Sequence, residues 1–424
     1  MILEKDIISF YNSKKIIRND IFIRISGFFL AILIFFAVNL PPSDLIPIKF
    51  GPFTLNVAAT LMLLFFTLIS FLSKRYQVEL SSADISMIGI SCIVLVNMSD
   101  IKQVMLFYFM FIALPYLTGK FLVYQNVGLI LKRIIGYSGI IQTLIILFKP
   151  FTFEASTSRG LFWQMSTQTA GGGYREVGSI GHPIVLATLL LPSFICWLDT
   201  LLDSSAKKTE KILSGIFTCL ILYSIFLTYS RGAWISLIVA TFAILIKRRV
   251  FKNTKSYIFA TLGALALVVL GGDLVTSISD RFAALNMNDG SLSHRSYMFA
   301  WTWDHLSKMN SNFLIGIGYY QSYPLLKSDV PPDGFAVMDN TFLTLIIELG
   351  LLGLFFFVFI VGKILMNLKL KYRKDTFITI IIISFLMQGF SFDMFSWEGC
   401  CIFLWLLIGY QANNTEMKSV ERSF

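Results

Sequence analysis

The stretch TFLTLIIELGLLGLFFFVFIV, residues 341–361, carries a single ionisable side chain, Glu348. About 20 consecutive apolar residues cross the hydrocarbon core of a bilayer as a helix. Lipid offers the backbone no hydrogen-bond partner, so a segment of this kind is expected to be helical. Outward from it, the chain contains twelve apolar segments, at 25–40, 53–72, 85–98, 104–117, 127–148, 183–198, 212–229, 233–246, 257–270, 341–361, 377–390 and 399–410.

The composition of the whole chain supports this interpretation. Of its 424 residues, 56% are hydrophobic and 14% charged, and the mean hydropathy is +0.72. Soluble domains contain about 45–50% apolar and about 25% charged residues. A soluble enzyme, a disordered scaffold, a secreted disulfide framework and a nucleic-acid-binding module are therefore excluded. The predicted fold is an all-α polytopic membrane protein of about 12 transmembrane helices, with residues 1–424 forming one integral membrane domain.

Cysteine and the N-terminus add little. The five cysteines fall in apolar segments, and their spacing does not match a metal-binding motif, so we expect neither a disulfide nor a metal. The basic residues Lys5, Lys14, Lys15 and Arg18 precede the first apolar segment, and no small-residue cleavage site follows it cleanly. The first segment is therefore interpreted as a retained span rather than a signal peptide.

The basic residues predict the topology. With the N-terminus in the cytoplasm, 25 of the 35 Lys and Arg residues fall on the cytoplasmic side and 10 on the outer side. This asymmetry fits the positive-inside rule, with both termini cytoplasmic, and explains the net charge of +10 without nucleic acid. Two outer loops are long, 149–182 and 271–340, and the larger is expected to carry short amphipathic helices. Loops of this length are typically functional.

Five arginines remain on the outer side: Arg159, Arg175, Arg231, Arg281 and Arg295. The guanidinium group binds phosphate through a planar, bidentate fork. Arg231, in the block YSRGAW, is predicted to begin a helix, where free backbone amides also attract anions. The alternative is an arginine that only anchors the helix to lipid headgroups.

Two of the other arginines lie in the long loops. Arg295 is predicted in the first turn of an amphipathic helix over 297–306, with Ser293 as its N-cap. The alternative for Arg295 is an ion pair with Asp280 or Asp289.

Arg175 lies in GGGYREVG, residues 171–178, where three glycines allow a tight loop. The alternative for Arg175 is an ion pair with the adjacent Glu176.

Acidic residues occur at the tenth segment. Asp339 and Asn340 both suit the N-cap of that helix, but only one can occupy it. If Asp339 is not the cap, its carboxylate is available as a base or to orient a hydroxyl. Glu348 is a functional candidate as an ionisable group within a span, and a structural hydrogen bond is the alternative.

The aromatic and histidine residues of the outer loops are weaker signals. His294 and His305 lack metal-ligand spacing. Trp301 and Trp303 suit a membrane-interface belt, with a sugar-stacking surface as the alternative.

Several blocks in this order resemble the O-antigen ligase and polymerase superfamily. They are YSRGAW at 229–234, Arg295 and Trp301 followed by NFLIGIGY at 312–319, DNTFL at 339–343, ELGLLG at 348–353, and residues 175–187. The resemblance covers 175–353 by motif and the whole chain by topology. The superfamily's ligases carry His where this chain has Asp339. That departure implies a Wzy-type repeat-unit polymerase, although it is a single position.

The resemblance implies a glycosyltransferase that joins undecaprenyl-pyrophosphate-linked repeat units at the periplasmic face of the inner membrane. Arg231 and Arg295 would then stabilise the leaving pyrophosphate, and Asp339 would act on the acceptor hydroxyl. The remaining candidate substrate-binding residues are Arg175, Arg159, Tyr174, His294, Asn340, Tyr319 and Glu348. Neither a metal nor another cofactor is required.

The expected partners are the lipid-linked oligosaccharide donor and acceptor, membrane lipids, a chain-length regulator and a flippase, but not nucleic acid. One alternative is an O-antigen ligase that transfers glycan to lipid A-core. A second is a polysaccharide flippase or other transporter. A transporter would place ionisable residues near the bilayer midplane, whereas this chain gathers its unusual residues outside the spans.

Overall fold

A computed structural model describes residues 23–39, 54–74, 80–98, 100–125, 127–148, 166–168, 174–250, 290–331, 334–366 and 376–420. The predicted segment 257–270, Arg159 and Arg281 lie outside these residues. The helices are Ile23–Asn39, α2 (Leu55–Lys74), α3 (Ser82–Val96), α4 (Ile101–Gln103), the π-helix η2 (Val104–Ala113), α5 (Leu114–Val123), α6 (Gly128–Phe148), α7 (Pro183–Leu201), α8 (Lys208–Leu227), α9 (Arg231–Lys247), α12 (Gly290–Lys308), the 3-10 helix η4 (Asn310–Phe313), α13 (Ser322–Ser328), α14 (Thr341–Met366), α15 (Thr376–Gln388), the 3-10 helix η6 (Met394–Ser396) and α16 (Glu398–Val420).

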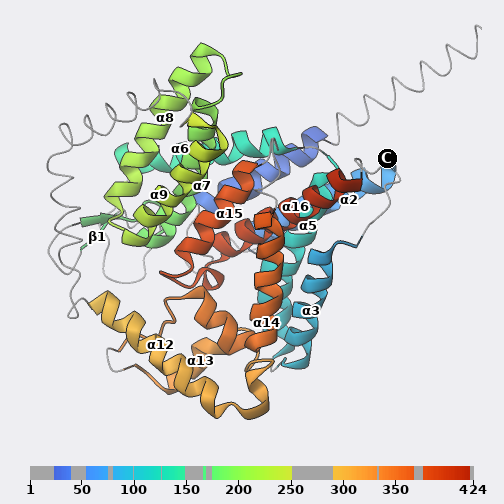
Figure 1. The fold of residues 1–424 in the computed structure, drawn as a ribbon, viewed down its shortest axis with the longest axis vertical. Coiled ribbons are helices and arrows are strands. Elements are labelled where there is room, and N and C mark those ends of the chain that lie inside the picture. Colours follow the sequence, from blue (N-terminus) through green and yellow to red (C-terminus); the bar gives the residue numbers. More distant parts are fainter. Residues whose placement is uncertain are drawn as a thin grey trace, which may run out of the picture.

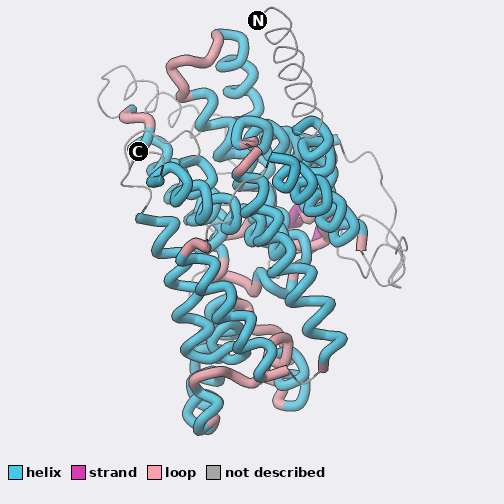
Figure 2. Tube along the Cα trace, turned by 90° about the vertical axis from the view of Figure 1, so that its right-hand side faces the viewer, coloured by secondary structure: helices cyan, strands magenta, loops and turns pink. Residues whose placement is uncertain are grey.

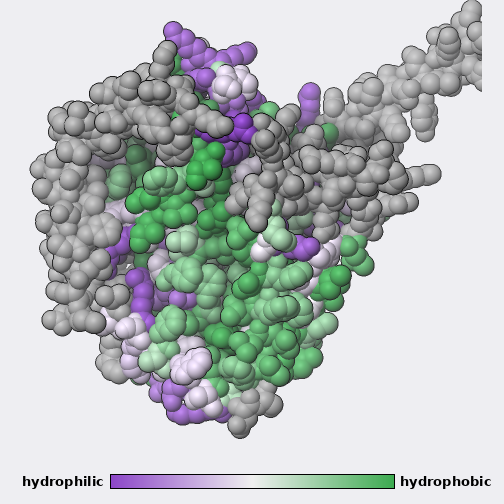
Figure 3. All heavy atoms as spheres, in the orientation of Figure 1, coloured by the Kyte–Doolittle hydropathy of each residue, from purple (hydrophilic) through white to green (hydrophobic). Residues whose placement is uncertain are grey.

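The described part of the chain is mostly helical, as predicted. Five of its helices, α2, α6, α7, α8 and α14, are long and apolar enough to cross a membrane, and four more are apolar but shorter. The face shown in Figure 3 carries a broad apolar surface between hydrophilic ends. These features fit an all-α membrane protein, while the number of twelve spans stays a prediction.

Helices α12 and α13 lie at one end of the molecule, and the turn between α7 and α8 lies at the opposite end (Figure 1). Between these ends Figure 2 shows mainly helices, with loops and a short pair of strands among them. The two ends of α9 carry different side chains. A cluster of ion pairs lies at one end of this helix, and Arg231 begins it at the other.

Close backbone contact joins α5 to α16. A Cβ atom on Gly119 would lie 2.1 Å from the carbonyl oxygen of Leu406, and one on Gly409 would lie 2.0 Å from that of Tyr116. Only glycine permits this approach at either position. Small residues are the usual means by which membrane helices pack closely, because lipid supplies no hydrophobic driving force between them.

Among the five candidate spanning helices, α7 is the most buried, and it packs against α6, α8, α9 and α15. Ser193 fills the place beside Gly139 of α6, where a Cβ atom would lie 2.1 Å from the serine Oγ. The same hydroxyl donates to the carbonyl oxygen of Ile135 at 2.6 Å. This contact fixes α7 against α6.

Asp199 organises the end of the bundle that carries the ion pairs. Its side chain is 1% exposed and accepts from Lys132 Nζ at 2.7 Å, Lys247 Nζ at 3.2 Å and Arg248 Nε at 2.7 Å. Arg248 Nη2 also lies 3.1 Å from Asp203 Oδ2. The cluster ties together the ends of α6, α7 and α9. All three cations were assigned to the cytoplasmic side, and the structure brings them to one place.

Asp199→Asn should lower the free energy of unfolding by about 3–5 kcal/mol, because three half-buried cations lose their shared counter-charge. Asp203→Asn is the matched control: Asp203 is more exposed and contacts only one of these cations, so its loss should cost about 0–1 kcal/mol. Equilibrium unfolding in mixed micelles measures both. Equal losses for the two variants would contradict the central role given to Asp199.

A break at Gly350 divides α14, which the sequence predicted as an uninterrupted span. Gly350 has φ 66°, and a Cβ there would lie 2.4 Å from the backbone of Leu314. The loop after η4 enters the break: Leu352 N donates to Leu314 O at 3.0 Å, and Gly318 N donates to Glu348 O at 3.0 Å. The inserted loop thus pairs backbone groups that the broken helix leaves unpaired, as the membrane environment requires.

A short two-stranded sheet occurs in the outer loop 149–182, where the sequence predicted no strand. Strand β1 (Ser166–Gln168) pairs antiparallel with β2 (Tyr174–Glu176), and Thr167 lies opposite Arg175. The glycine-rich stretch between them connects the two strands. The sheet matters because it fixes the backbone on which Arg175 lies.

Candidate functional site

The candidate site is built around the turn of residues 388–394, between α15 and η6. The first residue of α14 is joined to this turn at three points. Thr341 N donates to Gly389 O at 2.8 Å, and Thr341 Oγ1 donates to Phe392 O at 3.0 Å and accepts from Met394 N at 3.0 Å. Asp339 and Asn340, which precede Thr341, are therefore held beside the turn.

Arg295 reaches the same turn from α12. Its Nη2 donates to the carbonyl oxygen of Ser391 at 2.9 Å. The prediction that Ser293 caps this helix was wrong, because α12 begins at Gly290 and Ser293 lies inside it. Arg295 consequently lies in the second turn rather than the first, so free helix amides do not contribute to its surroundings.

Arg231 is the first residue of α9, as predicted, and Ser230 is the N-cap, whose side chain accepts from Ala233 N. A Cβ atom on Gly232 would lie 2.6 Å from Ser391 Oγ. Glycine is therefore required for α9 to approach the turn so closely. Ser391 contacts the Arg295 side chain and lies against Gly232 at the start of α9, so Arg295 and the backbone that carries Arg231 reach one turn.

Arg175 lies close by, on β2. Its Nε donates to the carbonyl oxygen of Thr228 at 2.9 Å. Thr228 ends α8, three residues before Arg231. Burial, with the Arg175 charge added, lowers the pKa of His182 at the N-cap of α7 to about 4. His182 is therefore neutral near pH 7, mainly because it is buried, and the Arg175 charge adds to the effect.

The structure separates the roles of Asp339 and Asn340. Asn340 Oδ1 accepts from Phe342 N at 2.9 Å and Leu343 N at 3.2 Å, so Asn340 is the N-cap of α14. Asp339 is not the cap, and its φ of 46° places it in the left-handed region that Asp and Asn tolerate best among non-glycine residues. Its carboxylate charge acts on a second acid across the turn.

That second acid is Asp393, which the sequence analysis missed. Its Oδ1 accepts from Phe395 N at 3.1 Å, which makes it the N-cap of η6. Burial, and to a smaller extent the Asp339 charge, raises the pKa of Asp393 to about 7, against the hydrogen bonds from Phe395 and Thr344. In the sequence Asp393 is one of two acids, with Glu398, in a short stretch between two apolar segments, and only the tertiary structure places it near Asp339.

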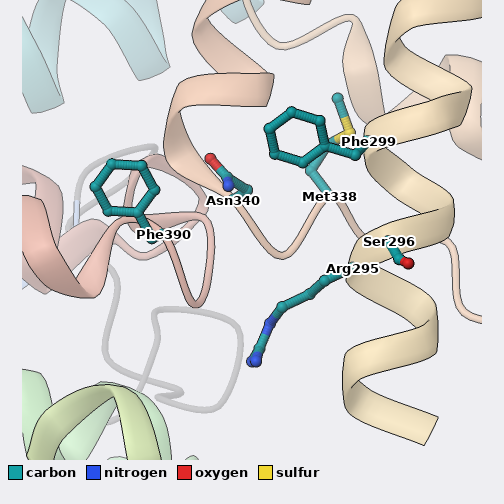
Figure 4. Close-up of a pocket in the computed structure, with 6 residues that line it drawn as sticks. All are labelled: Arg295, Ser296, Phe299, Met338, Asn340 and Phe390. Atoms are coloured by element: carbon teal, nitrogen blue, oxygen red, sulfur yellow. The ribbon is translucent and has the colours of Figure 1, made fainter. Parts of the chain in front are cut away.

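A cavity of about 450 Å³ borders Arg295; we call it the arginine cavity. It is lined by Arg295, Ser296, Phe299, Met338, Asn340 and Phe390. In Figure 4, Phe299 and Phe390 lie on either side of Asn340, and the Arg295 side chain extends from α12 away from them. The cavity thus places a guanidinium group beside apolar walls, which suits an anionic group attached to an apolar chain.

A second cavity, of about 280 Å³, lies on the other side of Met338; we call it the tyrosine cavity. Its lining combines aromatic rings, hydroxyl groups and two carboxylates: Tyr319, Tyr320, Ser322, Tyr323, Leu326, Ala336, Val337, Met338, Thr344, Glu348, Asp393, Phe395 and Ser396. Met338 lines both cavities. The two cavities are therefore neighbours separated by the segment that carries Met338 and Asp339.

Two predicted binding residues line the tyrosine cavity. Glu348 is buried and accepts from Ser322 Oγ at 2.6 Å and Ser322 N at 3.2 Å, so it holds the start of α13. This favours the structural alternative for Glu348. Tyr319 is 4% exposed, and its ring lies edge-on to Tyr108 at 5.6 Å. Burial raises the pKa of Tyr319, so its hydroxyl stays protonated.

His294 and the tryptophans organise the outer loop. His294 is buried, and its Nε2 lies 2.9 Å from Val337 O, which holds the cavity-lining segment against α12. Trp301 is buried and donates from Nε1 to Asp329 Oδ2 at 2.7 Å, so it packs within the loop rather than in a membrane-interface belt. Trp303 is exposed. Tyr174 lies on β2 beside Arg175.

Comparison with known families gives one match. Residues 216–358 match the model of the Wzy_C family, described as O-antigen ligase. No curated protein matches the chain. The matched region contains Arg231, Arg295, Asp339 and Asn340, whereas Arg175 and Asp393 lie outside it. In residues 216–358 the chain is thus similar to an O-antigen ligase family, which supports the O-antigen ligase and polymerase superfamily and an enzymatic role in the membrane.

Proposed function

We propose that this protein is a surface-polysaccharide polymerase that joins undecaprenyl-pyrophosphate-linked repeat units. The observation that carries the proposal is that the Arg295 side chain and the start of α9, where Arg231 lies, both reach Ser391, in the turn that also holds Asp393 near Asp339. Two guanidinium groups suit a pyrophosphate, and an acidic pair suits a sugar hydroxyl. The residue at the family's ligase histidine position is Asp339, which favours the polymerase within the superfamily.

The chemistry is a substitution at the anomeric carbon of the donor. The bond from this carbon to the pyrophosphate oxygen breaks, and a bond to the acceptor hydroxyl oxygen forms. The hydroxyl proton passes to the acidic pair. Asp339 acts on this hydroxyl either as the base or as the group that orients it. Negative charge develops on the leaving pyrophosphate, and Arg231 and Arg295 stabilise it as preorganised cations. Arg175 adds to the positive potential nearby.

The arginine cavity supports the donor assignment. Phe299 and Phe390 give it apolar walls, and Arg295 gives it a cation. A lipid pyrophosphate carries both matching features, a charged head and an apolar chain. We assign this cavity to the donor headgroup and to the first part of its lipid.

The acidic pair predicts a pH dependence. Asp393 accepts a proton only when ionised, and the pKa of Asp393 is about 7. The rate of polymer formation should therefore rise as the pH increases through about 7. Folding raises the pKa of Asp393, so the protonated carboxyl favours the folded state. Its contribution to the free energy of unfolding is lost as the pH rises to about 7 and the group ionises. Rates with purified lipid-linked substrate between pH 5.5 and 8.5, at about half-unit steps, measure the profile.

The control for this profile is Asp393→Asn, which keeps the capping oxygen of η6 but cannot ionise. Its residual activity should show no inflection near pH 7. An unchanged inflection in this variant would assign the titration to another group.

The topology proposed for this function places the site in the periplasm, with twelve spans, both termini in the cytoplasm and the protein in the inner membrane. Arg231 begins α9, and Lys247 and Arg248 of the Asp199 cluster lie at the other end of that helix, which supports opposite sides of the membrane for the two groups. In a background without native cysteines, Ser291→Cys should react with an impermeant thiol reagent in intact spheroplasts. Ser205→Cys, between α7 and α8, should react only after lysis. The reverse pattern would invert the topology.

An O-antigen ligase is the second candidate, favoured by the description of the matched family. The two functions predict different glycans in a deletion strain. Loss of a polymerase leaves a single repeat unit on the lipid A-core, whereas loss of a ligase leaves none. A chain-length regulator and a flippase would serve the polymerase as partners. Gel analysis of lipopolysaccharide from the deletion strain, with the gene restored as a control, separates the candidates.

A further inference from the structure

We propose that the tyrosine cavity binds the terminal sugar of the acceptor glycan and selects a neutral or amino sugar over one that carries a carboxylate. This inference rests on the proposed function and adds a substrate class to it. It is carried by three observations: the lining of the cavity, the sign of its charges, and its place beside the arginine cavity.

The lining suits a sugar ring. Tyr319, Tyr320, Tyr323 and Phe395 supply aromatic faces, on which the C–H faces of a pyranose pack. Ser322 and Ser396, with the other polar groups of the lining, supply hydrogen-bond partners for hydroxyl groups. A volume of about 280 Å³ lies at the lower end of the range for ligand sites, so the cavity suits one or two sugar residues rather than a whole repeat unit.

The charges suit a sugar without a carboxylate. Among the described residues that line the cavity, Glu348 and Asp393 are acidic and none is Lys or Arg. Lys327 Nζ lies 4.4 Å from the ring centroid of Tyr323, but Lys327 is not part of the lining. Where these two acids are ionised, a further carboxylate brought into this space would meet like charges at short range, whereas an amine would meet opposite ones.

The position suits an acceptor. Met338 lines both cavities, and Asp339 follows it directly, so a sugar in the tyrosine cavity lies next to the arginine cavity proposed for the donor. Asp393 lines the tyrosine cavity and interacts with Asp339. A hydroxyl at the Met338 side of this cavity would thus face the acidic pair and the anomeric carbon together. The same argument places the anionic group of the donor on the arginine side.

Binding of simple glycosides tests the inference without requiring turnover. The probes are methyl glucoside, methyl glucosaminide and methyl glucuronide, titrated into the full-length protein in nanodiscs and followed by saturation-transfer NMR. We expect the first two to bind, and the glucuronide to bind at least about tenfold more weakly, because its carboxylate meets like charges. A glucuronide that binds as tightly as the glucoside, or the failure of all three to bind, would overturn the inference.

A matched pair of variants locates the preference. Ser396 lines the cavity, is exposed and donates to Asp393 O at 2.8 Å. Ser328 ends α13, is also exposed and lies outside the lining. Ser396→Arg should bring glucuronide binding to within about threefold of glucoside binding, because the new cation offsets the acids. Ser328→Arg should leave the preference unchanged, and an equal effect of both would place the binding site elsewhere.

Transfer assayed with the same preparation separates the inference from the proposed function. Glycoside binding with the expected preference but no polymer would refute the polymerase and leave a saccharide site. Polymer formation without the preference would overturn the inference and leave the polymerase standing.

Discussion

Arg231→Ala and Arg295→Ala should each lower the rate of polymer formation by at least about 10²–10³-fold, the effect of removing one preorganised donor from a developing negative charge. The two residues come from different helices, but the Arg295 side chain and the helix start that carries Arg231 both reach Ser391, so loss of either should remove part of one site. Arg→Lys at either position should stay impaired, because an ammonium group cannot form the bidentate fork. The measurement is polymer formed in vitro from purified lipid-linked repeat unit.

Lys308→Ala is the matched control on the same helix as Arg295. Lys308 is exposed, and its ion pair with Asp304 lies far along α12 from the turn. Its loss should leave polymer formation within about twofold, since an exposed pair contributes little. Membrane insertion and thermal unfolding should be unchanged in all three variants. Normal polymer from both arginine-to-alanine variants would remove the pyrophosphate assignment.

Asp339→Asn should lower the rate by about 10²–10⁴-fold, the contribution typical of a positioned base or orienting group. The structure makes this substitution informative. Asn340 already caps α14, and Asn tolerates the left-handed backbone of residue 339, so the variant should fold normally. Removal of the neighbouring charge should also move the pH inflection assigned to Asp393 below about 7.

Asn340 provides the contrast. Asn340→Asp keeps a capping oxygen and should preserve stability, whereas Asn340→Ala should lower the free energy of unfolding by about 1 kcal/mol. Asp339→His should keep partial activity if the likeness to the ligases extends to this position. An Asp339→Asn variant with wild-type activity and an unchanged inflection in the pH–rate profile would exclude a chemical role for Asp339. The arginines would then be the residues to which a role in the reaction is still assigned.

The sequence by itself determined the membrane class, the helical content and the start of α9 at Arg231. Each of these depends on local properties. An apolar run must be helical in lipid whatever its neighbours, and the serine before Arg231 caps the helix through its own hydroxyl. The sequence also selected candidate site residues: Arg175, Arg231, Arg295 and Asp339. They stand out because charged residues are rare in so apolar a chain, and arginines on its outer side are rarer still.

Only the tertiary structure decided how these residues are used. The sequence left Asp339 and Asn340 as equal candidates for one cap, misplaced the start of α12, and gave no signal for Asp393. It also predicted α14 as unbroken, because the residues around Gly350 do not indicate that residues 314–318 enter the helix there. These features depend on segments that are distant in the chain. The site forms where α9, α12 and α14 contact the turn of residues 388–394. The packing of these helices, rather than the sequence pattern within each helix, determines where they come together.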